Sequence, residues 1–193
     1  MRKFNVAIFA SGTGSNFVCL YDYFEKLADI SIAFLLCNNS DAYVLKECEK
    51  RGQRAIFVSN DSVSNENYLT DLCLSESIDC IILAGFLRKI PVSLVRAFSG
   101  RIINVHPSIL PNFGGKGMYG QRVHQAVFDA GVKETGITIH FVSENFDEGA
   151  KIAQFYTSID ATDTPETIQQ KVQKLEHTYF PIVCSEIIKN LDV

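Results

Sequence analysis

Proline and glycine are sparse in this chain and too scattered to build a low-complexity segment: five prolines and twelve glycines occur among 193 residues. We find no internal repeat and no linker-like stretch. The length suits a single domain over residues 1–193, which would bury most of the surface that the unfolded chain exposes. With 47% apolar and 21% charged residues, the composition is that of an ordinary globular protein.

The chain also lacks an excess of basic residues: it has 18 Lys and Arg and 22 Asp and Glu, which gives a net charge of −4. Proteins that bind nucleic acid usually carry a basic surface, since phosphate contacts supply most of their affinity. We therefore expect no nucleic-acid partner. A single pocket can still oppose the overall sign and take a small anionic substrate.

The six cysteines lack the C-x-x-C spacing of zinc and redox sites. Most lie in apolar or helical runs, where a free cysteine behaves as a small hydrophobic residue. This usage favours a reducing, cytoplasmic location without disulfides. The four histidines are dispersed and form no H-x-x-E-H signature, so we expect no metal site.

Long apolar runs are absent as well. Residues 4–10, which follow Met1 closely, could be mistaken for the start of a signal peptide, but Asn5 interrupts the run and Ser11 and Gly12 end it. A first buried strand is the better interpretation. Nothing approaches the length of a membrane-spanning helix, so we expect no membrane partner.

What the sequence does contain is an alternation of β-rich apolar runs with amphipathic segments. This order is typical of an α/β fold with a doubly wound, mostly parallel sheet and helices on both faces. Ligands bind such sheets outside the carboxyl ends of the strands, which selects the loops after Ala10, Ala84 and Val105. The last two predicted strands form either a hairpin or separate strands of the sheet. Strands are predicted over residues 4–10, 30–37, 54–58, 80–84, 101–105, 136–142 and 151–159, and helices over 16–27, 42–51, 65–75 and 121–130 and from Pro91 and Pro165 onward.

The first of these loops, from Gly12 to Asn16, lies between a strand and a helix and predicts a phosphate site. Glycines let the backbone approach a ligand closely, and the N–H groups of a helix N-terminus favour an anion. A dinucleotide-binding loop would have a third glycine at Phe17 and an acid near Asn38. The loop therefore suits a lone phosphate better than NAD. A turn that binds nothing is the alternative.

Asn104 and His106 lie where the fifth predicted strand ends. Side chains two positions apart on a strand point to the same side, ~7 Å apart, so an amide and an imidazole project together at the carboxyl edge. A carboxylate from the loop 143–149 could stabilise the charged imidazole. Periodicity alone does not choose between Asp147 and Glu148. The alternative is an acidic surface loop and a histidine that only forms hydrogen bonds at a strand end.

Five motifs follow one another along the chain: Ser11-Gly12-Thr13-Gly14-Ser15-Asn16, Ala84-Gly85-Phe86-Leu87-Arg88, Asn104-Val105-His106-Pro107-Ser108-Ile109-Leu110-Pro111, Gly136-Ile137-Thr138-Ile139-His140-Phe141-Val142 and Glu176-His177. Together they resemble the phosphoribosylglycinamide formyltransferase family, folate-dependent enzymes of purine synthesis. The order is that of the family and spans nearly the whole chain. The glycine loop is a weak signal by itself, whereas N-x-H-P-S-x-L-P followed by H-F-V and D-x-G is specific to folate formyltransferases.

The resemblance implies the formyltransferase fold, with a Rossmann-like phosphate-binding half over residues 1–105 and a folate and catalytic half over residues 106–193. It implies transfer of the formyl group of N10-formyltetrahydrofolate, the co-substrate, to the amine of glycinamide ribonucleotide. In that reaction Asn104 donates to the oxyanion, and His106, held protonated by Asp147, moves the proton to the departing folate nitrogen. No metal is implied.

The resemblance also assigns binding residues and so selects Asp147 over Glu148. It places the substrate's phosphate and ribose on one group of side chains and the folate on another. The phosphate and ribose group is Gly12, Thr13, Gly14, Ser15, Asn16 and Glu176, and the folate group is Leu87, Arg88, Lys89, Ile90, Asn104, His140, Ser143 and Asp147.

Two departures from the family pattern stand out. Family members often carry an arginine at the start of the third helix, facing the glutamate tail of the folate, where this chain has Asn65. The segment 112–120 is longer than the family's shorter versions and contains four glycines. It is either a mobile flap, in which Lys116 reaches an anion, or an ordered surface loop.

Two other functions remain open at this stage. The chain could be a formyltransferase for another amine, such as initiator methionyl-tRNA or an amino-sugar nucleotide, although those relatives usually append a further domain. It could also be a non-catalytic α/β module that binds phosphate. We expect small-molecule partners and a monomer or loose homodimer.

Overall fold

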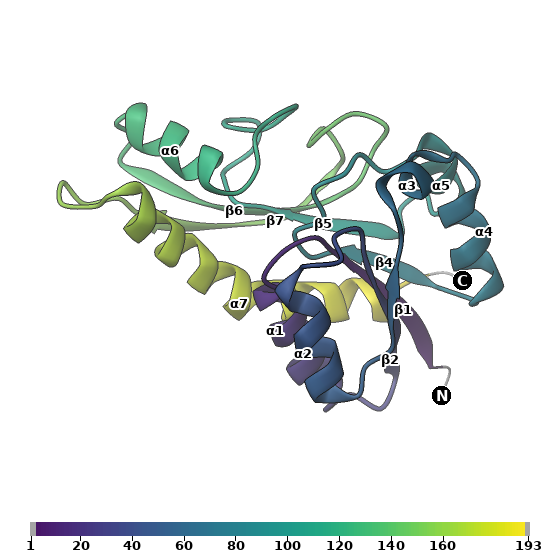
Figure 1. The fold of residues 1–193 in the computed structure, drawn as a ribbon. Helices are drawn as coiled ribbons and strands as arrows, with labels where there is room; N and C mark the ends of the chain where they lie inside the picture. Colours follow the sequence, from purple (N-terminus) through teal and green to yellow (C-terminus); the bar gives the residue numbers. More distant parts are fainter. Residues whose placement is uncertain (1–2, 192–193) are drawn as a thin grey trace.

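A seven-stranded sheet forms the centre of the computed structural model, which describes residues 3–191. The strands lie in the order β3-β2-β1-β4-β5-β6-β7; the first five in this order are parallel, and β6 and β7 are antiparallel to their neighbours (Figure 1). The predicted α/β fold with a mostly parallel sheet is therefore confirmed. The strands are β1 (Phe4–Ala10), β2 (Ile30–Cys37), β3 (Ala55–Phe57), β4 (Cys80–Leu83), β5 (Ile102–His106), β6 (Glu134–Phe141) and β7 (Lys151–Ser158).

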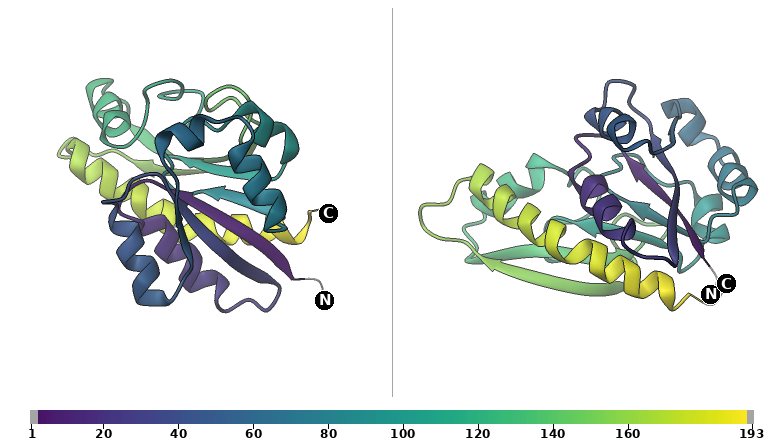
Figure 2. Two further views of the ribbon diagram at one scale, coloured as in Figure 1. Left: turned by 45° about the vertical axis from the view of Figure 1, so that its right-hand side comes forward. Right: turned by 90° about the horizontal axis from the view of Figure 1, so that it is seen from below.

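Helices cover both faces of this sheet. Buried side chains of α1, α2, α6 and α7 join one apolar cluster, and those of α3, α4 and α5 join a second cluster on the opposite face. Figure 2 shows the long α7 running beside α1 along the sheet. The helices are α1 (Ser15–Phe24), α2 (Tyr43–Arg51), α3 (Asn60–Ser64), α4 (Tyr68–Ser75), α5 (Val92–Ala97), α6 (Gln121–Asp129) and α7 (Pro165–Lys189).

Strand β1 explains why the sequence folds this way. Successive side chains of a strand point to opposite faces, and here Val6 and Ile8 enter one cluster while Ala7 and Phe9 enter the other. All four are fully buried. A strand covered on both faces has to be apolar at every position, which is why this segment lacks the alternation of a half-exposed strand.

The helix predicted over residues 65–75 is wrong at its start. The chain forms α3 before it, and Asn65 is the C-cap residue of α3 rather than the first residue of a longer helix. Ser59 caps α3 by accepting a hydrogen bond from the backbone N–H of Ser62 at 3.2 Å. Because Val63 is the only buried residue of this short helix, no apolar stripe announces it in the sequence.

The remaining elements agree with the prediction to within a few residues. Gly52, in the left-handed region at φ 64°, ends α2, and Thr164 caps α7 as expected. The two strands whose pairing was open form a hairpin, β6 with β7, and β6 also pairs with β5. Among the helices of residues 3–191, none combines the length and the hydropathy needed to span a membrane.

Candidate active site

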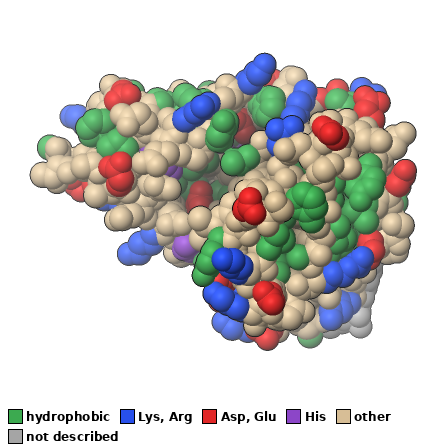
Figure 3. Space-filling model, viewed as in Figure 1, with side chains coloured by type: hydrophobic (Ala, Val, Ile, Leu, Met, Phe, Trp, Pro, Cys, Tyr) green, Lys and Arg blue, Asp and Glu red, His purple; other side chains and the backbone are tan. Residues whose placement is uncertain are grey.

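A pocket of about 330 Å³ opens at the carboxyl ends of β1, β4 and β5, where ligands bind such sheets. Its size is within the range of small-molecule sites. Figure 3 shows the hollow on this face, between the part of the molecule that carries α6 and the part that carries α3 to α5. The walls come from the start of α1, the loops after β4, β5 and β6, the start of α6 and the middle of α7.

Two side chains of β5 and one of β6 form the floor of this pocket. Asn104 and His106 are two residues apart on β5, and Asn104 lies opposite His140 in the antiparallel register. The loop that follows His106 is held by Thr138, whose hydroxyl donates to the carbonyl of Ser108 at 2.8 Å. The same hydroxyl oxygen accepts the backbone N–H of Leu110 at 2.9 Å. The sheet thus fixes where the imidazole and the amide project.

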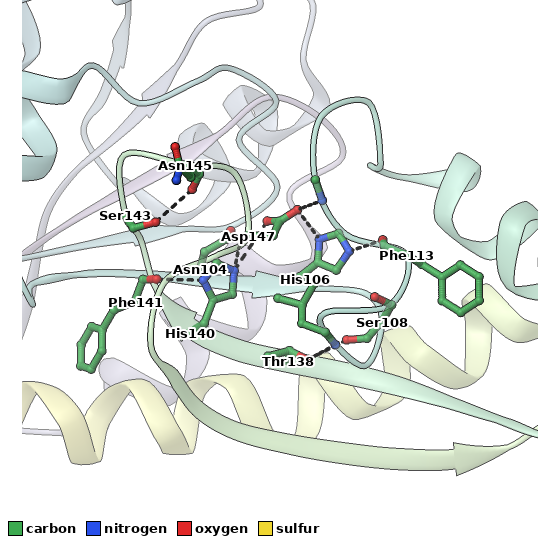
Figure 4. Close-up of polar contacts among 12 residues, drawn as sticks. Asn104, His106, Ser108, Phe113, Thr138, His140, Phe141, Ser143, Asn145 and Asp147 are labelled. Atoms are coloured by element: carbon green, nitrogen blue, oxygen red, sulfur yellow. Dashed lines mark hydrogen bonds and ion pairs between the residues drawn. The ribbon is translucent and has the colours of Figure 1, made fainter.

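Asp147 reaches the same place from the loop after β6 (Figure 4). Its Oδ2 lies 3.5 Å from Nδ1 of His106 and accepts the backbone N–H of Gly115 at 2.8 Å. Its Oδ1 lies 3.7 Å from Nε2 of His140. Asp147 adopts φ 57°, a left-handed conformation that is uncommon for a non-glycine residue. The carboxylate of Glu148 instead accepts a hydrogen bond from Asn145 at 2.7 Å.

Both ring nitrogens of His106 face acceptors. Nε2 lies 2.8 Å from the carbonyl oxygen of Phe113, which can only accept a hydrogen bond, while Nδ1 faces the carboxylate of Asp147. A neutral imidazole carries one N–H and a protonated one carries two. The geometry therefore suits the imidazolium form. The ring is 4% exposed, so water competes little for either contact.

His140 faces the same carboxylate from β6, through its Nε2. Its Nδ1 donates to the carbonyl of Phe141 at 2.8 Å, so its Nε2 is free to accept from the amide Nδ2 of Asn104 at 3.1 Å. Burial lowers the pKa of His140, which keeps the ring neutral. The amide of Asn104 is thereby oriented, with its second N–H available to a ligand.

The glycine loop and α7 form the other end of the pocket. Gly14, at φ 83°, precedes the first residue of α1. The hydroxyl of Ser15 accepts a hydrogen bond from Gln173 at 3.0 Å, and the amide of Asn16 donates to Glu176 at 2.9 Å. These contacts join the start of α1 to α7, although about 160 residues separate the partners.

Glu176 and Asn16 present acceptors to this end of the pocket. Loss of water raises the pKa of Glu176 to about 7, although the hydrogen bond from Asn16 lowers it. The Oδ1 atom of Asn16 is buried and has no hydrogen-bond partner within the described residues. A carboxylate and an unpaired amide oxygen need donors, so this end of the pocket suits a ligand with hydroxyl or N–H groups.

The structure brings most of the predicted site residues together. Gly12 and Gly14 lie in the adjoining loop and do not themselves line the pocket. Those that line it are Thr13, Ser15, Asn16, Leu87, Arg88, Lys89, Ile90, Asn104, His106, His140, Ser143, Asp147 and Glu176.

The prediction missed Gln173 and His124, which also line this pocket. Gln173 lies three residues before Glu176 on α7, so helical spacing gave a signal for it. Nothing in the sequence distinguishes His124, which is 4% exposed and whose pKa burial lowers to about 4.

The segment 112–120 is not only a surface loop, because its backbone contacts His106 and Asp147 through Phe113 and Gly115. Within residues 3–191, no group of three or more His, Cys, Asp or Glu is placed to hold a metal ion.

The chain is similar to known proteins over nearly its whole length. A family model described as formyl transferase matches residues 4–184. The chain is 39% identical over 193 residues to phosphoribosylglycinamide formyltransferase of Bacillus subtilis, covering 97% of this chain and 95% of that protein. It is 37% identical over 202 residues to the chloroplastic phosphoribosylglycinamide formyltransferase of Arabidopsis thaliana, covering 97% of this chain and 68% of that protein. The crystal structure of phosphoribosylglycinamide formyltransferase from Anaplasma phagocytophilum matches with a TM-score of 0.88 at 27% identity, covering 98% of this chain and 89% of that one. The chain belongs to the formyl transferase family.

Proposed function

We propose that this protein transfers the formyl group of N10-formyltetrahydrofolate to the amine of glycinamide ribonucleotide, a step of purine biosynthesis. The observation that carries the proposal is the convergence of Asn104, His106 and Asp147 beside a glycine loop that opens α1. The names of two relatives, each matched over 97% of this chain, support the choice of acceptor. A cytoplasmic location, inferred from the cysteine usage, stays a prediction.

The acceptor's phosphate and ribose fit the end of the pocket formed by the glycine loop and α7. Ser15 and Asn16 lie in the first turn of α1, where backbone N–H groups lack helical partners and favour an anion. Glu176 and the unpaired Oδ1 of Asn16 offer acceptors for ribose hydroxyls. On this assignment residues 1–105 supply the phosphate loop, and residues 106–193 supply Glu176 as well as the catalytic loops.

The folate fits the other end of the pocket, where it would supply the reactive formyl group. Phe86, Ile90 and Val142 are apolar lining residues there, which suits a flat heterocycle. Polar groups of the loops 87–90 and 143–147 fix its orientation. Lys89 lies 5.7 Å from the ring centroid of Phe146, and the two residues draw these loops together at the rim.

Three side chains act on the reacting groups. Asn104, oriented by His140, directs its free N–H at the formyl oxygen, where negative charge develops; such a donor is worth roughly 3–4 kcal/mol, ~10²–10³ in rate. The acceptor amine bonds to the formyl carbon and the bond from that carbon to the folate nitrogen breaks. His106 passes a proton to the departing nitrogen and regains one from the amine; such proton transfer adds ~10²–10⁴. Asp147 stabilises the charged ring. Holding both substrates in one pocket supplies much of the remaining acceleration.

The test is to mix the purified protein with glycinamide ribonucleotide and N10-formyltetrahydrofolate and to follow deformylated folate by absorbance. We expect rapid turnover by the natural chain and a loss of ~10²–10³ in Asn104→Ala. Turnover with another amine, but not with glycinamide ribonucleotide, would assign a different acceptor. Binding of both substrates without any transfer would leave only the non-catalytic module.

A further inference from the structure

A chain of hydrogen bonds crosses the carboxyl ends of three neighbouring strands beneath the pocket. The hydroxyl of Ser11, at the end of β1, accepts the backbone N–H of Leu87 at 2.9 Å. It donates to Oδ1 of Asn38, at the end of β2, at 2.6 Å. The amide of Asn38 then donates to Asn60, the first residue of α3, at 2.8 Å. Every donor meets an acceptor, so the bonds can strengthen one another.

Ser11 holds the Leu87 segment at two points. Besides its hydroxyl, its backbone N–H donates to the carbonyl of Gly85 at 3.1 Å. Gly85 adopts φ 77°, which turns the chain sharply after β4. Ser11 is 7% exposed, so water reaches this contact poorly.

Neither Ser11 nor Asn38 lines the pocket, whereas Gly85 and Leu87 do. An effect of either polar side chain on a ligand must therefore pass through a segment joined to Ser11, either the loop that its hydroxyl holds or the glycine loop that follows it. The loop belongs to the folate end of the pocket, and Ser11 immediately precedes the glycine loop of the phosphate end.

We propose that Ser11 is a positioning residue that places the folate-binding loop 85–90 and makes folate affinity depend on Asn38, a residue outside the pocket. This inference rests on the proposed function. The hydroxyl fixes the backbone of Leu87 against the end of β1, and Asn38 fixes the hydroxyl. The Ser11 side chain thus fixes the position of the loop 85–90 relative to the glycine loop that follows Ser11.

Ser11→Ala removes the hydroxyl and keeps the backbone contact. We expect the Kd of tetrahydrofolate, measured by titration calorimetry, and the KM of formyl-folate to rise about tenfold, the upper range for one neutral hydrogen bond. We expect kcat to fall less than threefold, because Asn104, His106 and Asp147 are untouched. Ser185→Ala is the matched control, since Ser185 is 4% exposed and its hydroxyl, among residues 3–191, donates only to the carbonyl of Ile182. It should leave both constants unchanged.

Asn38→Ala is the second variant, and we expect it to fold because Asn38 is partly exposed. We expect about a threefold rise in the Kd of tetrahydrofolate, which is less than the loss of one whole hydrogen bond would cause. The double variant Ser11→Ala/Asn38→Ala should show no further rise over Ser11→Ala alone. Additive effects, or a Kd within 1.5-fold of the natural chain for Asn38→Ala, would overturn the inference. A natural chain that neither binds tetrahydrofolate nor transfers formyl groups would instead reject the proposed function.

Discussion

Oδ2 of Asp147 lies 3.5 Å from Nδ1 of His106, on the side of the ring opposite the Phe113 carbonyl. The same oxygen accepts the backbone N–H of Gly115 at 2.8 Å. One carboxylate therefore joins the loop after β6, the loop after β5 and the imidazole on β5 itself. Its charge is the feature that the proposed proton transfer requires.

Asp147→Asn keeps the shape of this side chain and removes its charge. We expect kcat to fall by ~10²–10⁴, the usual range for positioned acid–base catalysis, and both KM values to stay within threefold. Steady-state kinetics from pH 6 to 9 measure the change. Glu148→Gln is the matched control, because that carboxylate is bonded to Asn145 and does not line the pocket. A loss of turnover in Glu148→Gln, with none in Asp147→Asn, would reverse the assignment.

Much of this site could be predicted because it follows from strand periodicity and sheet topology. Asn104 and His106 share a side of β5, and a parallel sheet places ligands at its carboxyl edge. Asp147 could not be chosen over Glu148 from the residues alone. It adopts a left-handed conformation in a loop, and no repeating pattern governs the direction of a loop side chain.

Contacts between segments far apart in the sequence could not be predicted either. His140 orients Asn104 only because β6 pairs with β5 in one particular register, and that register is a property of the folded sheet. The link between Ser11 and Asn38 likewise joins the ends of two different strands. Helix α3 was missed for a local reason, since one buried residue in five makes no periodic signal.

Gly14→Ala tests the phosphate loop. A Cβ at this position would lie 2.6 Å from the side chain of Val44, and φ is 83°. We expect a loss of about 1–3 kcal/mol in the free energy of unfolding and a rise in the KM of the ribonucleotide, because the loop must move. Urea denaturation and initial rates measure the two effects.

The control for this change is Gly12→Ala, in the same loop. A Cβ there meets nothing within 4 Å, and the residue does not adopt a positive φ. Its stability should stay within about 0.5 kcal/mol of the natural chain. Equal losses in the two variants would mean that the loop tolerates no side chain for a reason other than Val44.

His124 makes the free energy of unfolding depend on pH. Its pKa is about 4 in the folded chain because it is buried, against about 6.5 when unfolded. Between these values the unfolded chain binds more protons, so the free energy of unfolding falls as the pH decreases. We expect His124 to account for about 2 kcal/mol of loss between pH 7 and 5.

Comparing urea denaturation of the natural chain with His124→Gln at both pH values isolates this contribution, since all other titrating groups are shared. The natural chain should lose about 2 kcal/mol more than the variant over this interval. Parallel losses in the two proteins would show that His124 does not remain neutral on folding.

Glu176 makes the affinity for the ribonucleotide depend on pH, because burial raises the pKa of this carboxyl group. Its pKa of about 7 lies above the ordinary value because of burial, and only the ionised carboxylate offers two acceptors to ribose hydroxyls. The KM of the ribonucleotide should therefore fall about tenfold from pH 6 to 8, in step with the ionised fraction. Folding responds in the reverse sense: between about pH 4.5 and 7 the folded chain binds more protons, so the free energy of unfolding decreases as the pH rises.

Glu176→Gln separates both effects from ionisation of the substrate's own phosphate, which is common to the two proteins. We expect the variant to bind the ribonucleotide weakly at pH 8 and to lose the part of the pH dependence that the carboxylate contributes. We also compare the free energies of unfolding of the variant and the natural chain. The difference in favour of the variant should be larger at pH 8 than at pH 5, and this increase should be up to about 3 kcal/mol. A KM that falls equally steeply with pH in both proteins would mean that Glu176 does not contact the ribose as a carboxylate.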